Sequence, residues 1–170
     1  MNRTYNTFID NGLFVAEYIL KKPYQEISNA DLSKNTYLFA DKIGQLIEEK
    51  EFYRKIVFTT HLNSCLTNRS KKKNIIPIIR EQFDKLIEDV SEEKNCIYCS
   101  KKQVNTDLQI DRKYMYGLVS QTFYNSANNL QTVDMCPVCA FLSLLSILNI
   151  QKIGMPTLYD SDSDSLKLAS

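Results

Sequence analysis

The sequence predicts an α+β fold that is predominantly helical and cross-linked by four cysteines. Two Cys-x-x-Cys motifs, at Cys96–Cys99 and Cys136–Cys139, stand far apart in the chain. Several segments place apolar residues at every third or fourth position, which is the spacing of one helix face. The segment directly after the second motif is apolar on nearly all sides, which is typical of a helix at the centre of a core.

Length and composition allow one domain with a hydrophobic core of its own. The chain has 170 residues, and 44% of them are hydrophobic. It has only four glycines, so it is not a flexible or low-complexity polymer. With 21 basic and 20 acidic residues, the net charge gives no argument for nucleic-acid binding. Such an argument has to come from local clusters of charge.

The sequence contains no feature of a membrane or secreted protein. Residues 1–10 lack the apolar centre of a signal peptide. The apolar run 141–150 is too short and too interrupted to span a bilayer. We therefore expect a cytoplasmic protein with no membrane partner. Reduced thiols that hold a metal suit that compartment better than disulfides do.

Residues 1–92 predict a helical N-terminal region that opens with a short buried helix. The segment Asp10-Asn11-Gly12 is typical of a turn or a helix start, and apolar residues follow it at helical spacing. We expect Lys21-Lys22-Pro23 to end this helix, because proline cannot continue it.

Two longer helices are predicted in the same region. Ser28 stands three residues before Asp31, a variant of the capping box, and one long helix is expected from about Asn29 to Lys50. Apolar residues repeat at helical spacing between about Ile75 and Val90, which predicts the next helix. Pro77 is acceptable there only because it falls in the first turn.

Residues 93–154 predict a second region, in which the cysteine module and a buried helix pack together as one domain. Residues 112–119 predict a strand between the two motifs. The buried helix opens at the second motif, with Pro137 near its first turn, and runs to Ile150. Residues 155–170 predict a short strand followed by a disordered tail.

Four of the five cysteines predict one structural zinc site. The ligands would be Cys96, Cys99, Cys136 and Cys139. A Cys-x-x-Cys turn places two sulfurs on one side of a tight knuckle, and two such turns supply the four thiolates of a zinc-ribbon-like module. A site closed by four thiolates leaves no coordination position for water. We therefore expect Zn²⁺ to stabilise the fold and to perform no chemistry.

Several segments, in their order along the chain, resemble a known family. They are Thr7–Gly12, the polar loop around residues 63–68, the CIYC motif, the stretch Tyr116–Asn125, and the CPVC motif that opens an apolar helix. In that order they resemble the N-terminal part of the CRISPR-associated CXXC-CXXC protein family. That family supplies the large subunit of type I-B interference (Cascade) complexes. The resemblance covers about the whole chain but only the leading part of the family, whose members are considerably longer.

The resemblance implies a non-enzymatic part in antiviral defence. Such a subunit contributes to the binding of foreign DNA directed by a guide RNA, and to recognition of the short flanking motif, the PAM. The implied partners are other Cascade subunits, guide RNA and target DNA, with no small-molecule substrate. No catalytic residue is implied, because a recruited helicase-nuclease cleaves the DNA.

One polar and basic cluster is the candidate for nucleic-acid contact. Its members are Asn63, Asn68, Arg69, Lys71, Lys72 and Lys73. Lysine and arginine neutralise phosphates, and asparagine hydrogen-bonds base edges. The alternative is a solvated loop that leads into the next helix. Weaker candidates of the same kind flank the cysteine module: Lys101, Lys102, Arg112 and Lys113.

Two other functions stay open. A CPVC motif followed by a helix has the form of a glutaredoxin-type active site, in which the helix N-terminus lowers the thiol pKa. That site needs an apolar strand before it, whereas residues 126–134 are mostly polar. A free-standing zinc ribbon that binds nucleic acid or a protein partner would have the same zinc content as a Cascade subunit. His61 and Cys65 have no recognisable catalytic constellation around them.

Overall fold

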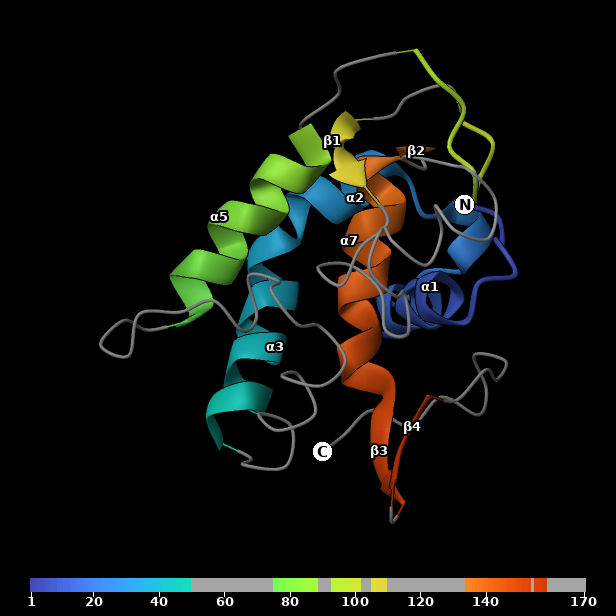
Figure 1. Cartoon of the computed structure of the whole chain (residues 1–170). Helices are drawn as coiled ribbons and strands as arrows, with labels where there is room; N and C mark the ends of the chain where they lie inside the picture. The colour runs from blue at the N-terminus through green and yellow to red at the C-terminus, as the bar shows by residue number, and fades with distance from the viewer. Residues whose placement is uncertain (50–74, 89–92, 102–104, 110–133, 154, 159–170) are drawn as a thin grey trace, which may run out of the picture.

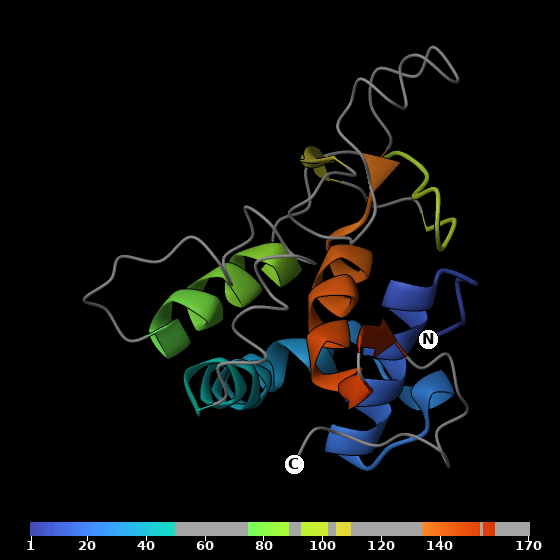
Figure 2. The same ribbon diagram turned by 60° about the horizontal axis from the view of Figure 1, so that its bottom comes forward.

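The computed structural model describes residues 1–49, 75–88, 93–101, 105–109, 134–153 and 155–158. These residues are mostly helical. Helix α7 (Pro137–Leu145) lies at the centre, between α1 (Thr7–Leu20) on one side and α3 (Thr36–Glu49) and α5 (Ile75–Glu88) on the other (Figure 1, Figure 2). The shorter helical elements are η1 (Tyr24–Glu26), α2 (Asn29–Lys34) and η2 (Ser146–Asn149).

The strands form two small antiparallel pairs. Strand β1 (Asn105–Gln109) pairs with β2 (Asp134–Met135), which leads directly into the second cysteine motif. Strand β3 (Ile150–Ile153) pairs with β4 (Met155–Leu158), and this hairpin extends from the end of the α7 and η2 segment (Figure 1). The predicted short strand at residue 155 is therefore present as β4, and the sequence missed its partner.

Buried side chains from both ends of the chain form one hydrophobic core. Its large members include Phe39, Phe83 and Phe141, each 0% exposed. They come from α3, α5 and α7, and Ile9 and Leu13 of α1 belong to the same cluster, so the core joins residues 1–92 to residues 93–154. The division of the chain into three regions stays a prediction.

Helix α1 begins earlier than the sequence predicted. The Asn6 side chain accepts hydrogen bonds from the N–H groups of Phe8 and Ile9, at 3.1 and 3.2 Å, and so caps the helix. The predicted start at residues 10–12 is therefore wrong, and those residues are buried inside the helix. The predicted end is confirmed, because Lys21 takes a left-handed conformation with φ of 53° and ends α1.

The single helix predicted from Asn29 to Lys50 is two helices, α2 and α3. The capping box of Ser28 and Asp31 is confirmed at the start of α2. Asn35 ends α2, because its side-chain amide turns back to donate to the Asp31 carbonyl at 2.7 Å. The Asn35 carbonyl then accepts from the N–H groups of Leu38 and Phe39 and so begins α3.

Helix α7 is shorter than the predicted helix to Ile150. It ends at Leu145, the chain continues as η2, and Ile150 begins β3. The hydroxyls of Ser143 and Ser146 each donate to a backbone carbonyl three residues earlier, at 2.7 Å. Serine bonds of this kind compete with the regular hydrogen bonding of a helix. The predicted burial of this segment on all sides is confirmed, since nearly every residue from 137 to 149 is buried.

Helix α5 is confirmed from Ile75 to Glu88, with Pro77 in its first turn. The strand predicted at residues 112–119 and the tail from residue 159 onward lie outside the described residues. None of the helices that the structure describes combines the length and the apolarity needed to cross a membrane.

Candidate metal centre

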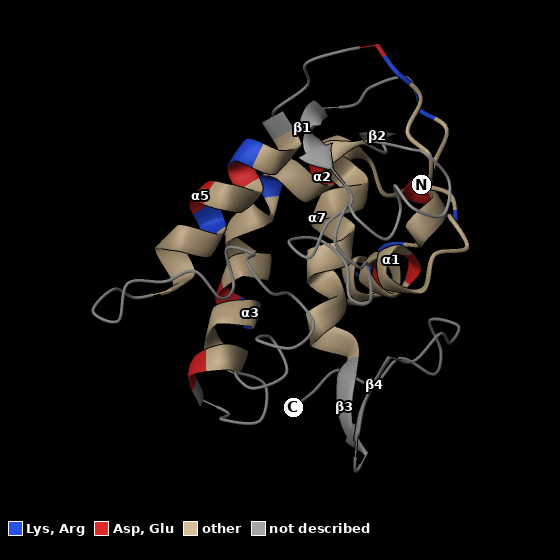
Figure 3. Cartoon of the chain, viewed as in Figure 1, with Lys and Arg blue, Asp and Glu red and all other residues tan. Residues whose placement is uncertain are grey.

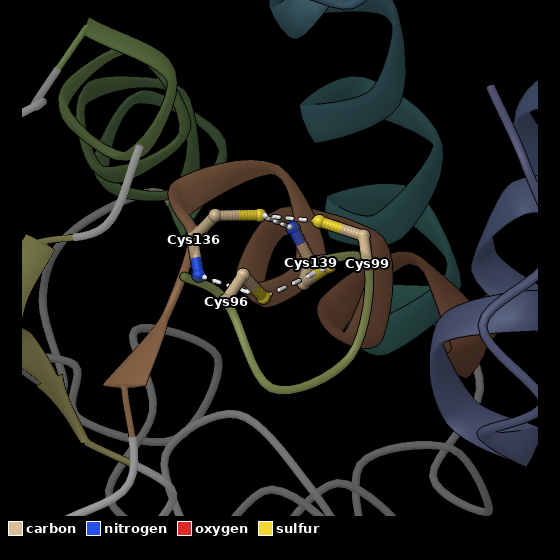
Figure 4. Close-up of side chains that lie close together, drawn as sticks. All are labelled: Cys96, Cys99, Cys136 and Cys139. Carbon is tan, nitrogen blue, oxygen red and sulfur yellow. Dashed lines mark hydrogen bonds between the residues drawn. The ribbon is translucent and has the colours of Figure 1, made fainter. Parts of the chain in front are cut away.

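The structure brings the four predicted ligands together. Their sulfur atoms, from Cys96, Cys99, Cys136 and Cys139, all lie within 4.8 Å of one another. The Cys96 and Cys139 sulfurs are 3.8 Å apart, and the Cys99 and Cys136 sulfurs are 3.6 Å apart. All four side chains point toward a common centre (Figure 4). Two motifs separated by more than 30 residues thus form one cluster that can hold a metal ion.

A tight backbone turn positions the first pair of sulfurs. The Cys96 N–H donates to the Lys101 carbonyl at 2.8 Å, and the Ser100 N–H donates to the Cys96 carbonyl at 2.9 Å. Ser100 closes the turn with φ of 57°, in the left-handed region that favours glycine. These bonds fold residues 96–101 into a knuckle that holds Cys96 and Cys99 on the same side.

The start of α7 positions the second pair. Cys136 is the N-cap residue of α7, and its sulfur accepts from the Cys139 N–H at 3.4 Å. Pro137 occupies the first turn, where the missing N–H costs nothing. The Cys136 N–H in turn donates to the Cys96 sulfur at 3.3 Å and links the two motifs directly. Backbone N–H groups at the positive end of a helix stabilise thiolate charge.

Burial and mutual contact perturb the four thiols strongly. Cys96, Cys136 and Cys139 are buried, whereas Cys99 is partly exposed. The hydrogen bond with Cys136 is the main cause that lowers the pKa of Cys99 to about 7. Hydrogen bonding with Cys136, followed by that with Cys96 and Cys99, raises the pKa of Cys139. Four sulfurs so close together cannot all ionise alone, but a bound cation would stabilise all four thiolates.

The residues predicted to contact nucleic acid are not placed by the structure. Asn63, Asn68, Arg69, Lys71, Lys72 and Lys73 lie outside the described residues, as do His61 and Cys65. Their predicted roles stay predictions. Lys101 is described and exposed, directly after the first cysteine motif.

Sequence reasoning missed a second feature, a buried carboxylate in the first turn of α1. Asp10 is only 1% exposed. One of its oxygens accepts from the Thr4 N–H and hydroxyl at 2.7 and 2.9 Å. The other accepts from the Tyr5 N–H at 3.0 Å and forms an ion pair with Arg3 Nε at 3.4 Å. Neither periodicity nor spacing in the sequence indicates this arrangement. From the sequence, Asp10 was interpreted as part of a turn or helix start.

Comparison of the chain with protein-family models, with curated proteins and with solved structures finds no match to any of them.

Proposed function

We propose that Cys96, Cys99, Cys136 and Cys139 bind one structural zinc ion. The observation that carries this proposal is the distance between the sulfurs, 3.6 and 3.8 Å for two of the pairs. A tetrahedral zinc ion with Zn–S bonds of about 2.3 Å requires sulfurs about 3.8 Å apart. An iron–sulfur cluster also uses four cysteines, but its core of several atoms would need a wider space between them.

Bound zinc would cross-link the first knuckle to the N-terminal end of α7. Such a metal site contributes its binding free energy directly to folding. The β1–β2 pair, which leads into Cys136, supports a zinc-ribbon-like arrangement of this module. Four thiolates fill the coordination sphere, so zinc here would organise the fold and would not activate water.

At the level of the whole protein, we propose a non-enzymatic subunit of an antiviral complex. Its role would be that of the N-terminal part of a type I-B Cascade large subunit, which takes part in binding foreign DNA under the direction of a guide RNA. The order of the sequence motifs supports this proposal, and so does the convergence of the two cysteine motifs that the resemblance includes. The partners would be guide RNA, target DNA and other Cascade subunits.

Elemental analysis of the purified, untagged protein under reducing conditions tests the metal proposal. We expect one zinc per chain, with four thiols protected from a thiol reagent until a chelator is added. Iron and sulfide in its place would show that the centre is a cluster. A metal-free protein with a readily formed disulfide between Cys136 and Cys139 would favour the glutaredoxin-like function instead.

Co-purification tests the proposed complex separately from the metal. The protein, tagged and expressed in its native cells, should recover a repeat-derived guide RNA and further protein subunits in fixed ratio. Zinc-loaded protein that recovers neither would favour the free-standing zinc-ribbon function. The zinc measurement and the recovery of RNA are independent, so each proposal can fail alone.

A further inference from the structure

A cavity opens beside the proposed zinc centre. Its volume is about 430 Å³, and it lies between the N-terminal residues 1–5 and the two cysteine motifs. Cys99, Cys136 and Cys139 are among its lining residues, with Val138 and Leu142 from α7. Sites that bind small organic groups in proteins have volumes of about 300 to 1,000 Å³. The cavity is therefore large enough for one nucleotide base and part of its sugar.

An aromatic side chain is held at this cavity in an exposed position. Tyr5 lines the cavity and is 90% exposed. Its backbone has φ of 59°, which is uncommon for a residue other than glycine. The buried Asp10 carboxylate imposes this conformation through its bonds to Arg3, Thr4 and Tyr5. Backbone strain of this kind lowers stability and is found mainly where a protein binds or acts on a ligand.

The expected charge differs between the cysteine side of the cavity and its exposed edge. Four thiolates around a zinc ion leave a net negative charge on the side formed by the cysteines. Lys101 lines the cavity and is exposed, whereas Arg3, which also lines it, is paired with the buried Asp10 carboxylate. Figure 3 shows both acidic and basic residues on segment 93–101, with basic residues on each side of the cysteine motif. An uncharged group is therefore favoured inside the cavity, and an anionic group is favoured at its edge.

We propose that this cavity binds one unpaired base of a single-stranded nucleic acid. The base stacks on Tyr5, with Tyr98 on the knuckle side of the cavity, and its phosphate lies near Lys101. Aromatic rings that stack bases, next to cations that neutralise the backbone, are the general means of binding single strands. This inference rests on the nucleic-acid binding proposed above and adds to it residues that do not belong to the predicted cluster at residues 63–73.

Fluorescence anisotropy of labelled single strands tests the site. The probes are RNA and DNA oligonucleotides of about 12 nucleotides, with a duplex of the same sequence for comparison. For the zinc-loaded full chain we expect single strands to bind more tightly than the duplex. Tyr5→Ala should raise the Kd about tenfold. Tyr18→Ala is the matched control, because Tyr18 is an exposed tyrosine of α1 that does not line the cavity.

A salt titration of the same binding tests the phosphate contact. Lys101→Ala should reduce the slope of log Kd against log salt by about one. Lys85→Ala, which removes an exposed lysine of α5, should leave that slope nearly unchanged. Zinc content and circular dichroism of each variant report whether it is folded.

The outcomes separate this inference from the proposal on which it rests. If Tyr5→Ala and Tyr18→Ala both bind single strands tightly and with the same Kd, the cavity is not the binding site for a base. The proposed nucleic-acid function would still stand. No binding of any oligonucleotide at low salt would overturn both. Tighter binding of the duplex would also contradict base binding in the cavity, because a paired base cannot enter the cavity without flipping out of the helix.

Discussion

The two sides of helix α7 are buried in opposite ways. Toward α1, Gly12 lets two backbones meet, and a Cβ atom at Gly12 would lie 1.7 Å from the carbonyl oxygen of Leu142. Toward α3 and α5, Phe141 packs edge-on against Phe39 and Phe83, with ring centroids 5.7 and 4.7 Å apart. One side requires the absence of a side chain, and the other requires three large ones.

This difference predicts how each side responds to substitution. A cluster of aromatic rings loses stability in proportion to the volume removed, and neighbouring side chains relax in part. A contact between two helix backbones has no side chain that can rotate away, so an added atom must displace a whole helix. The cysteine cluster lies at the N-terminal end of α7, and a metal ion bound there would stabilise the helix that both sides share.

The largest effect is expected from Cys136→Ser, which should disrupt both sides of α7 together. The substitution removes one of the four proposed zinc ligands and the sulfur that caps α7. Structural zinc sites in small modules have apparent binding free energies on the order of 10 kcal/mol or more. We expect loss of zinc in elemental analysis and a large fall in the thermal unfolding midpoint. Ile97→Ser is the matched control, because Ile97 lies within the knuckle but is 57% exposed and not a ligand.

A Cys136→Ser protein with full zinc content and an unchanged midpoint would show that this cysteine is not a ligand. Loss of zinc with an unchanged midpoint would instead show that α7 holds its position without the metal. In the second case the two sides of α7 would still differ as described, but the metal would not contribute to the stability of either side.

The next largest effect is expected on the aromatic side, from Phe141→Ala. Removal of a buried phenylalanine ring costs about 3 to 5 kcal/mol, because it combines lost burial with a cavity. Urea unfolding of the zinc-loaded protein measures the change in the free energy of unfolding. Phe141→Leu keeps most of the side-chain volume and should cost clearly less. Equal losses in the two variants would mean that the ring geometry, and not its volume, sets the stability of this side.

On the backbone side, Gly12→Ala should destabilise the protein although it adds a single methyl group. Overpacking of a close contact costs about 1 to 3 kcal/mol, and more where the backbone cannot shift. Alanine favours a helix by about 1 kcal/mol over glycine, so the sign of the result decides between the two effects. We expect the clash to win, as a lower free energy of unfolding in urea. A stabilised Gly12→Ala protein would show that α1 and α7 are not in backbone contact.

The sequence predicted the aromatic side of α7 far better than the backbone side. Phe141 and its neighbours follow helical spacing, and the four cysteines follow a motif, so both could be recognised from local patterns. Gly12 was interpreted as a turn residue, because nothing in its own segment shows that Leu142 lies against it. Asp10 was missed for a related reason, since its partners in residues 3–5 are fixed by the folded N-terminal segment and not by spacing.

The break between α2 and α3 teaches the same lesson at a helix end. Apolar residues continue at helical spacing on both sides of Asn35, so the pattern predicts one helix. The break is made by the hydrogen bonds of Asn35, and next to it the Thr36 hydroxyl donates to Asp84 of α5 at 2.5 Å. A contact between residues 48 positions apart leaves no trace in local periodicity. Apolar spacing therefore predicts which residues are buried, whereas hydrogen bonds that the spacing does not report decide where α2 ends and α3 begins.

The smallest effect is expected from Gly44→Ala, which separates the role of glycine from the role of backbone contact. Gly44 lies in α3, and a Cβ atom there would come within 2.3 Å of a side-chain carbon of Ile76 in α5. A side chain can rotate or shift where a helix carbonyl cannot, and the gain in helix propensity, about 1 kcal/mol, offsets the cost. We therefore expect a change of less than about 1 kcal/mol in urea unfolding. If Gly44→Ala lowers the free energy of unfolding as much as Gly12→Ala does, α3 and α5 are held as rigidly as α1 and α7. Glycine contacts would then differ from aromatic contacts, whether the glycine faces a backbone or a side chain.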